Sequence, residues 1–274
     1  MMYEKDSHTN AGVHGDDRSQ TQNRTDQIPV GQWPTRGTAV VGFIGKGGVG
    51  KSTLAVSLVV ALSKDLPVTL VDLDVDNCSG VRWATIRKQG GMPPIPMVAP
   101  GPGEAVEQAF ARAHDRAIAD ERFHILIVDL PGRPRRDLPD TIFSKLTLAY
   151  LPLEPTLMVA GASRRLLEGY RADGPAGPRV RPIVNRTRSD QRKVQAITMI
   201  GEGIAAPIAI REYVAHRDAY EEGLGVTEYD PKHGAASDIR SLVADLRGVL
   251  RTLAGRSRSI SMSDRQSTHR RGAA

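Results

Sequence analysis

Short continuous apolar runs alternate along the chain with stretches whose apolar residues recur at helical spacing. The continuous runs predict strands that are covered on both faces, and they lie at 40–44, 68–71, 125–128, 146–151 and 180–184. Helical spacing predicts helices at 52–63, 103–119, 155–171, 190–203 and 235–253. The segment 89–103 is dense in proline and glycine, which predicts a loop or a short edge strand.

Alternation of strands and helices in this order builds right-handed βαβ units. The predicted fold class is therefore α/β: a single domain with a mostly parallel, twisted sheet that is flanked by helices on both faces. The length of 274 residues also favours one large domain over two small ones.

The two ends of the chain differ from this middle part. Residues 1–36 hold almost no large apolar side chains, so they cannot bury enough surface to offset the entropy of ordering. We predict a disordered polar extension at 1–36, a compact domain at 37–254 and a basic, disordered tail at 255–274. No apolar run approaches the roughly 18 residues of a membrane span, and the start lacks the apolar core of a secretory signal, so we expect a cytoplasmic protein.

The cysteine content excludes several kinds of site, and the charge indicates a class of partner. The single cysteine, Cys78, excludes a disulfide framework, and within one chain it excludes a cysteine-ligated zinc site or a four-cysteine iron–sulfur cluster. The net charge is +6, and residues 251–274 carry six arginines but only one acidic residue, Asp264. Such a tail indicates an acidic partner, either nucleic acid or anionic lipid, although charge alone is equally compatible with a solvated end.

A glycine-rich segment between the first predicted strand and the first predicted helix matches the phosphate-binding loop. Gly45 is followed after four residues by Gly50, Lys51 and Ser52. Glycines let the backbone curl so that successive N–H groups point at phosphate oxygens, and the helix N-terminus adds partial positive charge. We expect Lys51 to reach the β- and γ-phosphates and the Ser52 hydroxyl to bind Mg²⁺. An ordinary glycine turn is the alternative, and the strand–helix context argues against it.

Carboxylates follow two of the predicted strands. Asp129 follows the strand at 125–128, in the arrangement that holds Mg²⁺ in P-loop nucleoside triphosphatases. Asp72 and Asp74 follow the strand at 68–71, and the carboxyl ends of parallel strands open onto one ligand crevice. We expect all three to converge near the nucleotide, with Asp72 anchoring structure and Asp74 orienting the attacking water. Asp76 is expected to be solvated.

The loop carries a second lysine, Lys46, and its sequence Lys-Gly-Gly-Val-Gly-Lys-Ser resembles the deviant Walker A box of the ParA/MinD superfamily. The resemblance extends from about residue 38 to residue 250. Matching segments are the second box at 71–74, the Walker B strand and switch at 127–132, the adenine-recognising strand end at 182–186, and a C-terminal part at 213–231 that favours partition ATPases of the ParA type.

This resemblance implies an ATP-sandwich homodimer that requires Mg²⁺. In this dimer Lys46 would contact the nucleotide of the partner subunit; the alternative is that Lys46 is a loop lysine that faces solvent. Asp74 would serve hydrolysis, and Ser52 and Asp129 would hold the metal. The nucleotide-binding residues implied are Lys46, Gly47, Gly48, Val49, Gly50, Lys51, Ser52, Thr53 and Asn185. Where the family usually has Pro-Gln after the second-box aspartate, this chain has Val75-Asp76.

The function implied is that of a nucleoid-associated positioning or partition ATPase. It would bind nonspecific double-stranded DNA, segregate a plasmid, a chromosome or another cargo, and be released when a ParB-like adaptor, or another small DNA-binding adaptor, with a basic N-terminus stimulates ATP hydrolysis. The candidate DNA-binding residues are Arg247, Arg251, Arg256 and Arg258. Arg211 is a weaker candidate that would serve the nucleotide instead. The extension at 1–36 is expected to be too short and too polar for a helix-turn-helix domain.

Alternatives remain open at this point. One is a MinD-like regulator of cell division that works on a membrane surface, but residues 256–262 offer only two bulky apolar groups for an amphipathic helix, so no membrane partner is expected. The other is a P-loop metabolic ligase or kinase that acts on a small substrate.

Overall fold

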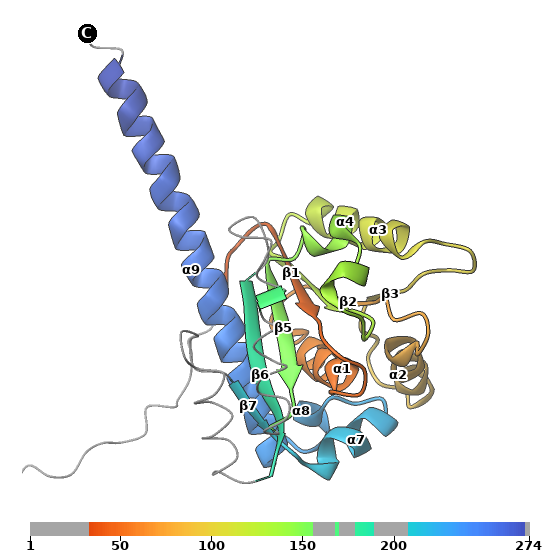
Figure 1. Cartoon of the computed structure of the whole chain (residues 1–274). Coiled ribbons are helices and arrows are strands. Elements are labelled where there is room, and N and C mark those ends of the chain that lie inside the picture. The colour runs from red at the N-terminus through yellow and green to blue at the C-terminus, as the bar shows by residue number, and fades with distance from the viewer. Residues whose placement is uncertain (1–32, 156–167, 170–178, 189–207, 272–274) are drawn as a thin grey trace, which may run out of the picture. The chain divides into compact units, whose positions relative to one another are not determined.

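The computed structural model describes residues 33–155, 168–169, 179–188 and 208–271, with side chains as far as Leu253 in the last helix (Figure 1). The predicted helices at 155–171 and 190–203 and the predicted extension at 1–36 lie wholly or mostly outside these residues. The predicted compact part of the chain is otherwise covered.

One parallel sheet organises the described residues. Its strands are β1 (Thr38–Phe43), β2 (Val68–Asp72), β3 (Met97–Val98), β4 (His124–Asp129), β5 (Leu148–Leu153), β6 (Arg179–Thr187) and β7 (Ile208–Arg211). They follow the order β3-β2-β4-β1-β5-β6-β7, and every neighbouring pair is parallel. The predicted α/β class is confirmed: each predicted strand overlaps an observed one, and the proline-rich segment contains the edge strand β3.

Helices lie on both faces of this sheet, because alternate residues of the inner strand β4 pack against different helices. In β4, Ile125 and Ile127 belong to a core cluster with residues of α1 (Lys51–Leu62) and α9 (Gly234–Arg271). Leu126 and Val128 belong to a second cluster with residues of α3 (Val106–Ala119) and α4 (Asp140–Phe143). Because β4 is buried on both faces, residues 125–128 form a continuous apolar run.

Further helical elements complete the described part: η1 (Arg135–Asp137), α2 (Ser79–Gln89), α7 (Val214–Glu221) and α8 (Val226–Tyr229). The sequence did not predict α2, which buries only Gly80, Trp83 and Arg87 and so lacks an apolar stripe. In the described part of the chain, none of the helices is long and apolar enough to cross a membrane.

Arg87 ties α2 to the segment that connects α7 with α8. Its side chain is 3% exposed, and its guanidinium donates hydrogen bonds to the Gly223 carbonyl (3.0 Å) and to the Glu228 carboxylate (2.8 and 2.9 Å). Gly223 has φ +70, and a Cβ there would lie 2.3 Å from the Arg87 backbone nitrogen, so the close approach requires glycine. This contact fixes the distance between two walls of the site described below.

The last helix differs from its prediction. We expected it to end near residue 253 and the chain beyond to be disordered, whereas α9 continues to Arg271. Residues 256–271 contain neither glycine nor proline, and a helix already nucleated gains one hydrogen bond for each residue added. The buried side chains of Ile239, Leu242 and Leu246 anchor the start of this helix on the core.

Candidate functional site

The loop between β1 and α1 has the curled backbone that its glycines predict. Gly45, Gly48 and Gly50 have φ values of +116, +78 and +92, in the left-handed region that residues with a Cβ rarely adopt. Helix α1 begins directly after Gly50, so its free N–H groups and the positive end of its dipole face the loop. The loop is therefore preformed for an anionic ligand.

Lys51 lies inside this loop. The residue is 6% exposed, and its Nζ donates a hydrogen bond to the Lys46 carbonyl oxygen at 3.1 Å. Burial lowers the pKa of Lys51, while the negative charges of Asp129 and Asp74 act to raise it. The chain thus holds a partly desolvated cation against the concave loop, whereas Lys46 itself is exposed.

Asp129 ends β4 beside the start of α1 and is 1% exposed. Burial raises its pKa to about 7, the Ser52 hydroxyl acts in the opposite direction, and the neighbouring Asp72 carboxylate adds to the rise. Neither carboxylate oxygen makes a hydrogen bond of regular geometry with the described residues. A buried carboxylate without such a partner, next to a hydroxyl, fits the oxygen ligands that Mg²⁺ requires.

The described residues contain no group of three or more His, Cys, Asp or Glu side chains that could hold a metal by themselves. That is compatible with Mg²⁺, because this ion usually keeps several waters and binds one or two carboxylates together with substrate phosphates.

The sheet brings Asp72 next to Asp129, as expected. The two residues are register partners on β2 and β4, and Asp72 is 2% exposed. Its carboxylate accepts hydrogen bonds from the backbone N–H groups of Val81 (3.1 Å) and Asp74 (3.2 Å). Burial raises the pKa of Asp72, and these backbone donors oppose that rise. Asp72 therefore connects the first turn of α2 to the end of β2.

Asp74 lies one step further out and is 6% exposed. Its charge acts on both Lys51 and Asp129, so these three side chains form one polar centre. Its carboxylate accepts a hydrogen bond from the Asn77 side-chain Nδ2 at 2.9 Å and one from the Asn77 backbone N–H at 3.3 Å. No role was expected for Asn77 from the sequence.

The segment after β4 packs on the glycine loop. A Cβ at Gly132 would lie 2.5 Å from the Gly47 backbone nitrogen, so only glycine permits this approach. The next residue, Arg133, donates a hydrogen bond to the Asp76 carboxylate at 3.1 Å, with both side chains at least half exposed. Such an exposed ion pair contributes little stability, about 0–1 kcal/mol.

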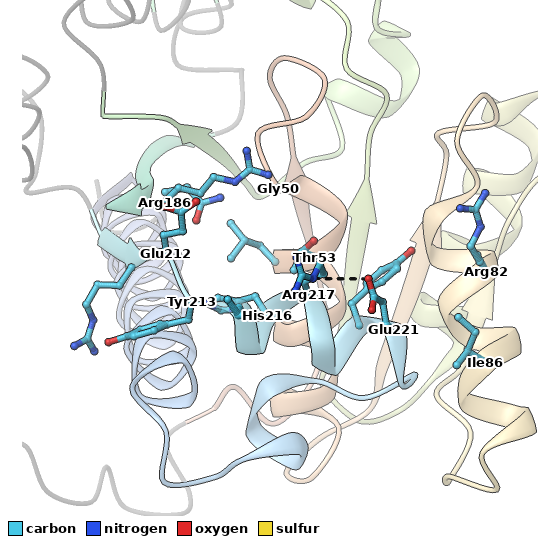
Figure 2. Close-up of a pocket in the computed structure, with 15 residues that line it drawn as sticks. Gly50, Thr53, Arg82, Ile86, Arg186, Glu212, Tyr213, His216, Arg217 and Glu221 are labelled. Atoms are coloured by element: carbon cyan, nitrogen blue, oxygen red, sulfur yellow. Dashed lines mark ion pairs between the residues drawn. The ribbon is translucent and has the colours of Figure 1, made fainter. Parts of the chain in front are cut away.

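A cavity of about 800 Å³ adjoins the loop. Asn185, at 6% exposed, joins β6 to the loop because its Nδ2 donates to the Val49 carbonyl at 2.7 Å, and Gly50 and Thr53 line the cavity beside it. Figure 2 shows Arg82 of α2 on one side of the cavity and Arg186, from the end of β6, on the other. Of the predicted nucleotide-binding residues, Gly50, Thr53 and Asn185 therefore line this cavity.

Residues from β7 and α7 complete the cavity, and most of them were not expected there from the sequence. Arg211, the weaker candidate, lines it, and Asp238 holds its guanidinium at 2.7 Å. His216 contributes a ring whose nitrogens are buried, and burial lowers its pKa. Tyr220 donates a hydrogen bond to the Ser79 carbonyl of α2 at 2.5 Å. The available signal in the sequence was the series Tyr213, His216 and Tyr220, which closely follows the apolar residues Ile208 to Ile210.

The set of candidate DNA-binding arginines needs a correction at Arg247. Its side chain is 12% exposed, its guanidinium lies 4.6 Å from the ring centroid of Trp33, and it faces Asp65 at 3.9 Å. A cation buried under an aromatic ring is not accessible to a phosphate backbone. Arg251 is exposed, whereas Arg256 and Arg258 lie on the α9 backbone with side chains outside the described residues.

Comparisons with known proteins identify the family and the fold. The model of the CobQ/CobB/MinD/ParA nucleotide binding domain matches residues 40–254. Among solved structures, the chain is similar to a ParA family ATPase from Chlorobium tepidum TLS at 20% identity and a TM-score of 0.54, with coverage of 74% of this chain and 96% of that one.

Two further solved structures have similar folds. One is the septum site-determining protein MinD of Pyrococcus horikoshii OT3, complexed with Mg-ADP, at 18% identity and a TM-score of 0.54, covering 78% of this chain and 99% of that one. The other is from the MinC:MinD cell division protein complex of Aquifex aeolicus, at 17% identity and a TM-score of 0.57, covering 79% and 96%. At these identities the similarity shows the fold alone.

A comparison with curated protein sequences found no match. The family match nevertheless spans most of the chain, from β1 to α9, and includes the glycine loop, both carboxylate-bearing strands and Asn185. The chain therefore belongs to the CobQ/CobB/MinD/ParA nucleotide binding domain family and is a ParA/MinD-family ATPase.

Proposed function

We propose that this chain is a ParA-like positioning ATPase, which forms an ATP-sandwich dimer, binds nonspecific double-stranded DNA and is released from it by hydrolysis. The observation that carries the proposal is the contrast between its two loop lysines. Lys51 is buried and bonded to the loop, whereas Lys46 is exposed on the same loop. A compact cation held on the outer side of a phosphate loop is suited to a phosphate in a second subunit.

Within one subunit, each group has a distinct task. Lys51 and the loop N–H groups from Gly47 to Ser52, with Thr53, would bind the phosphates of ATP, and Asn185 would contact the base at the cavity. The Ser52 hydroxyl and the Asp129 carboxylate would hold Mg²⁺, which supplies charge neutralisation when bound. Asp74 would accept a hydrogen bond from the attacking water and orient it toward the γ-phosphate.

The dimer is tested at Lys46. We expect Lys46→Ala to leave ATP affinity within about threefold of wild type, because the P-loop of the subunit itself stays intact, while the ATP-dependent dimer disappears. Analytical ultracentrifugation with a non-hydrolysable ATP analogue measures the second effect, and equilibrium titration of labelled ATP measures the first. Lys64→Ala, at an exposed lysine just beyond α1, is the matched control. A Lys46→Ala protein that still dimerises would contradict the proposal.

DNA binding is tested by retention on nonspecific duplex DNA across a salt series. If about six phosphates are neutralised, the affinity of the ATP form should fall roughly 10³-fold between 50 and 200 mM salt. Truncation after Ala254 removes Arg256 and Arg258, so it should weaken retention and reduce the salt slope. An unchanged slope would assign DNA binding to another surface, and absent retention with ATP would contradict the DNA-binding part of the proposal.

The same experiment separates the alternatives. A MinD-like membrane regulator would co-sediment with anionic vesicles in ATP and would not require DNA. A P-loop ligase or kinase would turn over rapidly with a small metabolite and show no dependence on DNA. Segregation of a plasmid, a chromosome or another cargo, with a ParB-like or other small DNA-binding adaptor of basic N-terminus, is the biological role that we propose for the DNA-binding form.

A further inference from the structure

The carboxylate of Asp74 is held by one neighbour, Asn77. The side-chain Nδ2 of Asn77 donates to Asp74 Oδ2 at 2.9 Å, and the Asn77 backbone N–H donates to Asp74 Oδ1 at 3.3 Å. One residue therefore contacts both oxygens of the carboxylate. This fixes the rotation of the carboxylate plane, which a single contact would leave free.

The backbone around this pair is also fixed. The Asp74 N–H donates to the buried Asp72 carboxylate at 3.2 Å, and the Asp74 carbonyl accepts a hydrogen bond from the Cys78 N–H at 2.7 Å. Cys78 has a positive φ of 46, so the chain turns sharply directly after Asn77. Asn77 is thus brought back over Asp74 by a short turn that is tied to β2 at its other end.

The two hydrogen bonds from Asn77 leave the Asp74 carboxylate able to accept others. An ionised carboxylate offers about four lone-pair sites, and Asn77 uses two of them. Asp74 itself is 6% exposed. The negative charge of this carboxylate also acts on Lys51 of the phosphate loop.

We propose that Asn77 is a positioning residue for hydrolysis, which holds the Asp74 carboxylate in the orientation needed to align the attacking water. The inference rests on the role of Asp74 in the proposed function. Asn77 itself contacts neither nucleotide nor water in this scheme, and it acts only through Asp74. It directly follows Val75 and Asp76 in the turn after β2.

Asn77→Ala removes the side-chain donor and retains the backbone one. We expect kcat for ATP hydrolysis to fall about 10- to 100-fold, since small misplacements of a catalytic group cost rate on this scale, while KM and the equilibrium affinity for ATP stay within about twofold. Asn77→Asp keeps the shape but replaces the amide donor by a second carboxylate, so its loss should be at least as large. Single-turnover phosphate release measures the rate, and titration of labelled ATP measures the affinity.

Val75→Ala, in the same exposed turn, is the matched control and should retain wild-type turnover. Placed in an Asp74→Ala background, Asn77→Ala should change the residual rate no further, because the residue it positions is gone. Unchanged or faster turnover in Asn77→Ala, or an equal loss in Val75→Ala, would overturn this inference. Wild-type turnover in Asp74→Ala alone would instead overturn the hydrolytic role of Asp74 in the proposed function, so the two failures are distinguishable.

Discussion

Replacing Lys51 by alanine is expected to abolish nucleotide binding at micromolar concentrations. The lysine is buried in the loop, with its Nζ 3.1 Å from a loop carbonyl, so the site presents a desolvated cation before any ligand arrives. Removing one partner of a buried charge pair costs about 3–5 kcal/mol, which corresponds to a loss of roughly 10²- to 10⁴-fold in affinity. Equilibrium titration of labelled ATP measures the loss.

The same variant should remain folded, and this makes the result interpretable. Burial lowers the pKa of Lys51, which means that its charged form is disfavoured in the nucleotide-free protein. Its removal therefore relieves a desolvation cost, and the unfolding temperature without nucleotide should not drop by more than a few degrees. Lys64→Ala again provides the exposed-lysine control. Wild-type ATP affinity in a folded Lys51→Ala protein would refute the phosphate-binding role.

Replacing Asp74 by alanine should stop hydrolysis without preventing ATP binding. A positioned general base contributes about 10²- to 10⁴-fold to a rate, so phosphate release should fall by that factor. The phosphate loop, Lys51 and the buried Asp129 carboxylate remain in place, and the variant should accumulate as an ATP-bound dimer that stays on DNA. Single-turnover assays, ultracentrifugation and DNA retention measure these three properties on one preparation.

Asp76→Ala is the control for Asp74, since it removes a carboxylate two residues away. Asp76 is exposed and paired only at the surface with Arg133, so its loss should change turnover less than about threefold. A trapped dimer in the Asp74 variant and normal cycling in the Asp76 variant would support the mechanism. Equal losses in the two variants would indicate a general disturbance of the turn, and the assignment of Asp74 would then fail.

Elements of the fold were predictable where burial requires a recognisable pattern of apolar residues in the sequence. Strands β1, β2, β4 and β5 are covered on both faces, so each has a mainly apolar sequence and each was predicted, as was β6, although Arg181 interrupts its apolar residues. The short strand β7 and the helices α2, α7 and α8 were missed. They bury few apolar residues each and are held mainly by polar contacts, such as those of Arg87 with Gly223 and Glu228.

The chain sequence alone determined the phosphate loop, the family and the edge of the sheet at which Asp72, Asp74 and Asp129 meet. It could do so because these features depend on residues close in sequence and on the ends of buried strands, whose positions follow from local patterns. Folding alone decided the walls of the cavity, where α2, β6 and α7 meet, and the burial of Arg247 beneath Trp33. Those contacts join side chains far apart along the chain, so packing selects them, and no local pattern in the sequence specifies which distant residues come together.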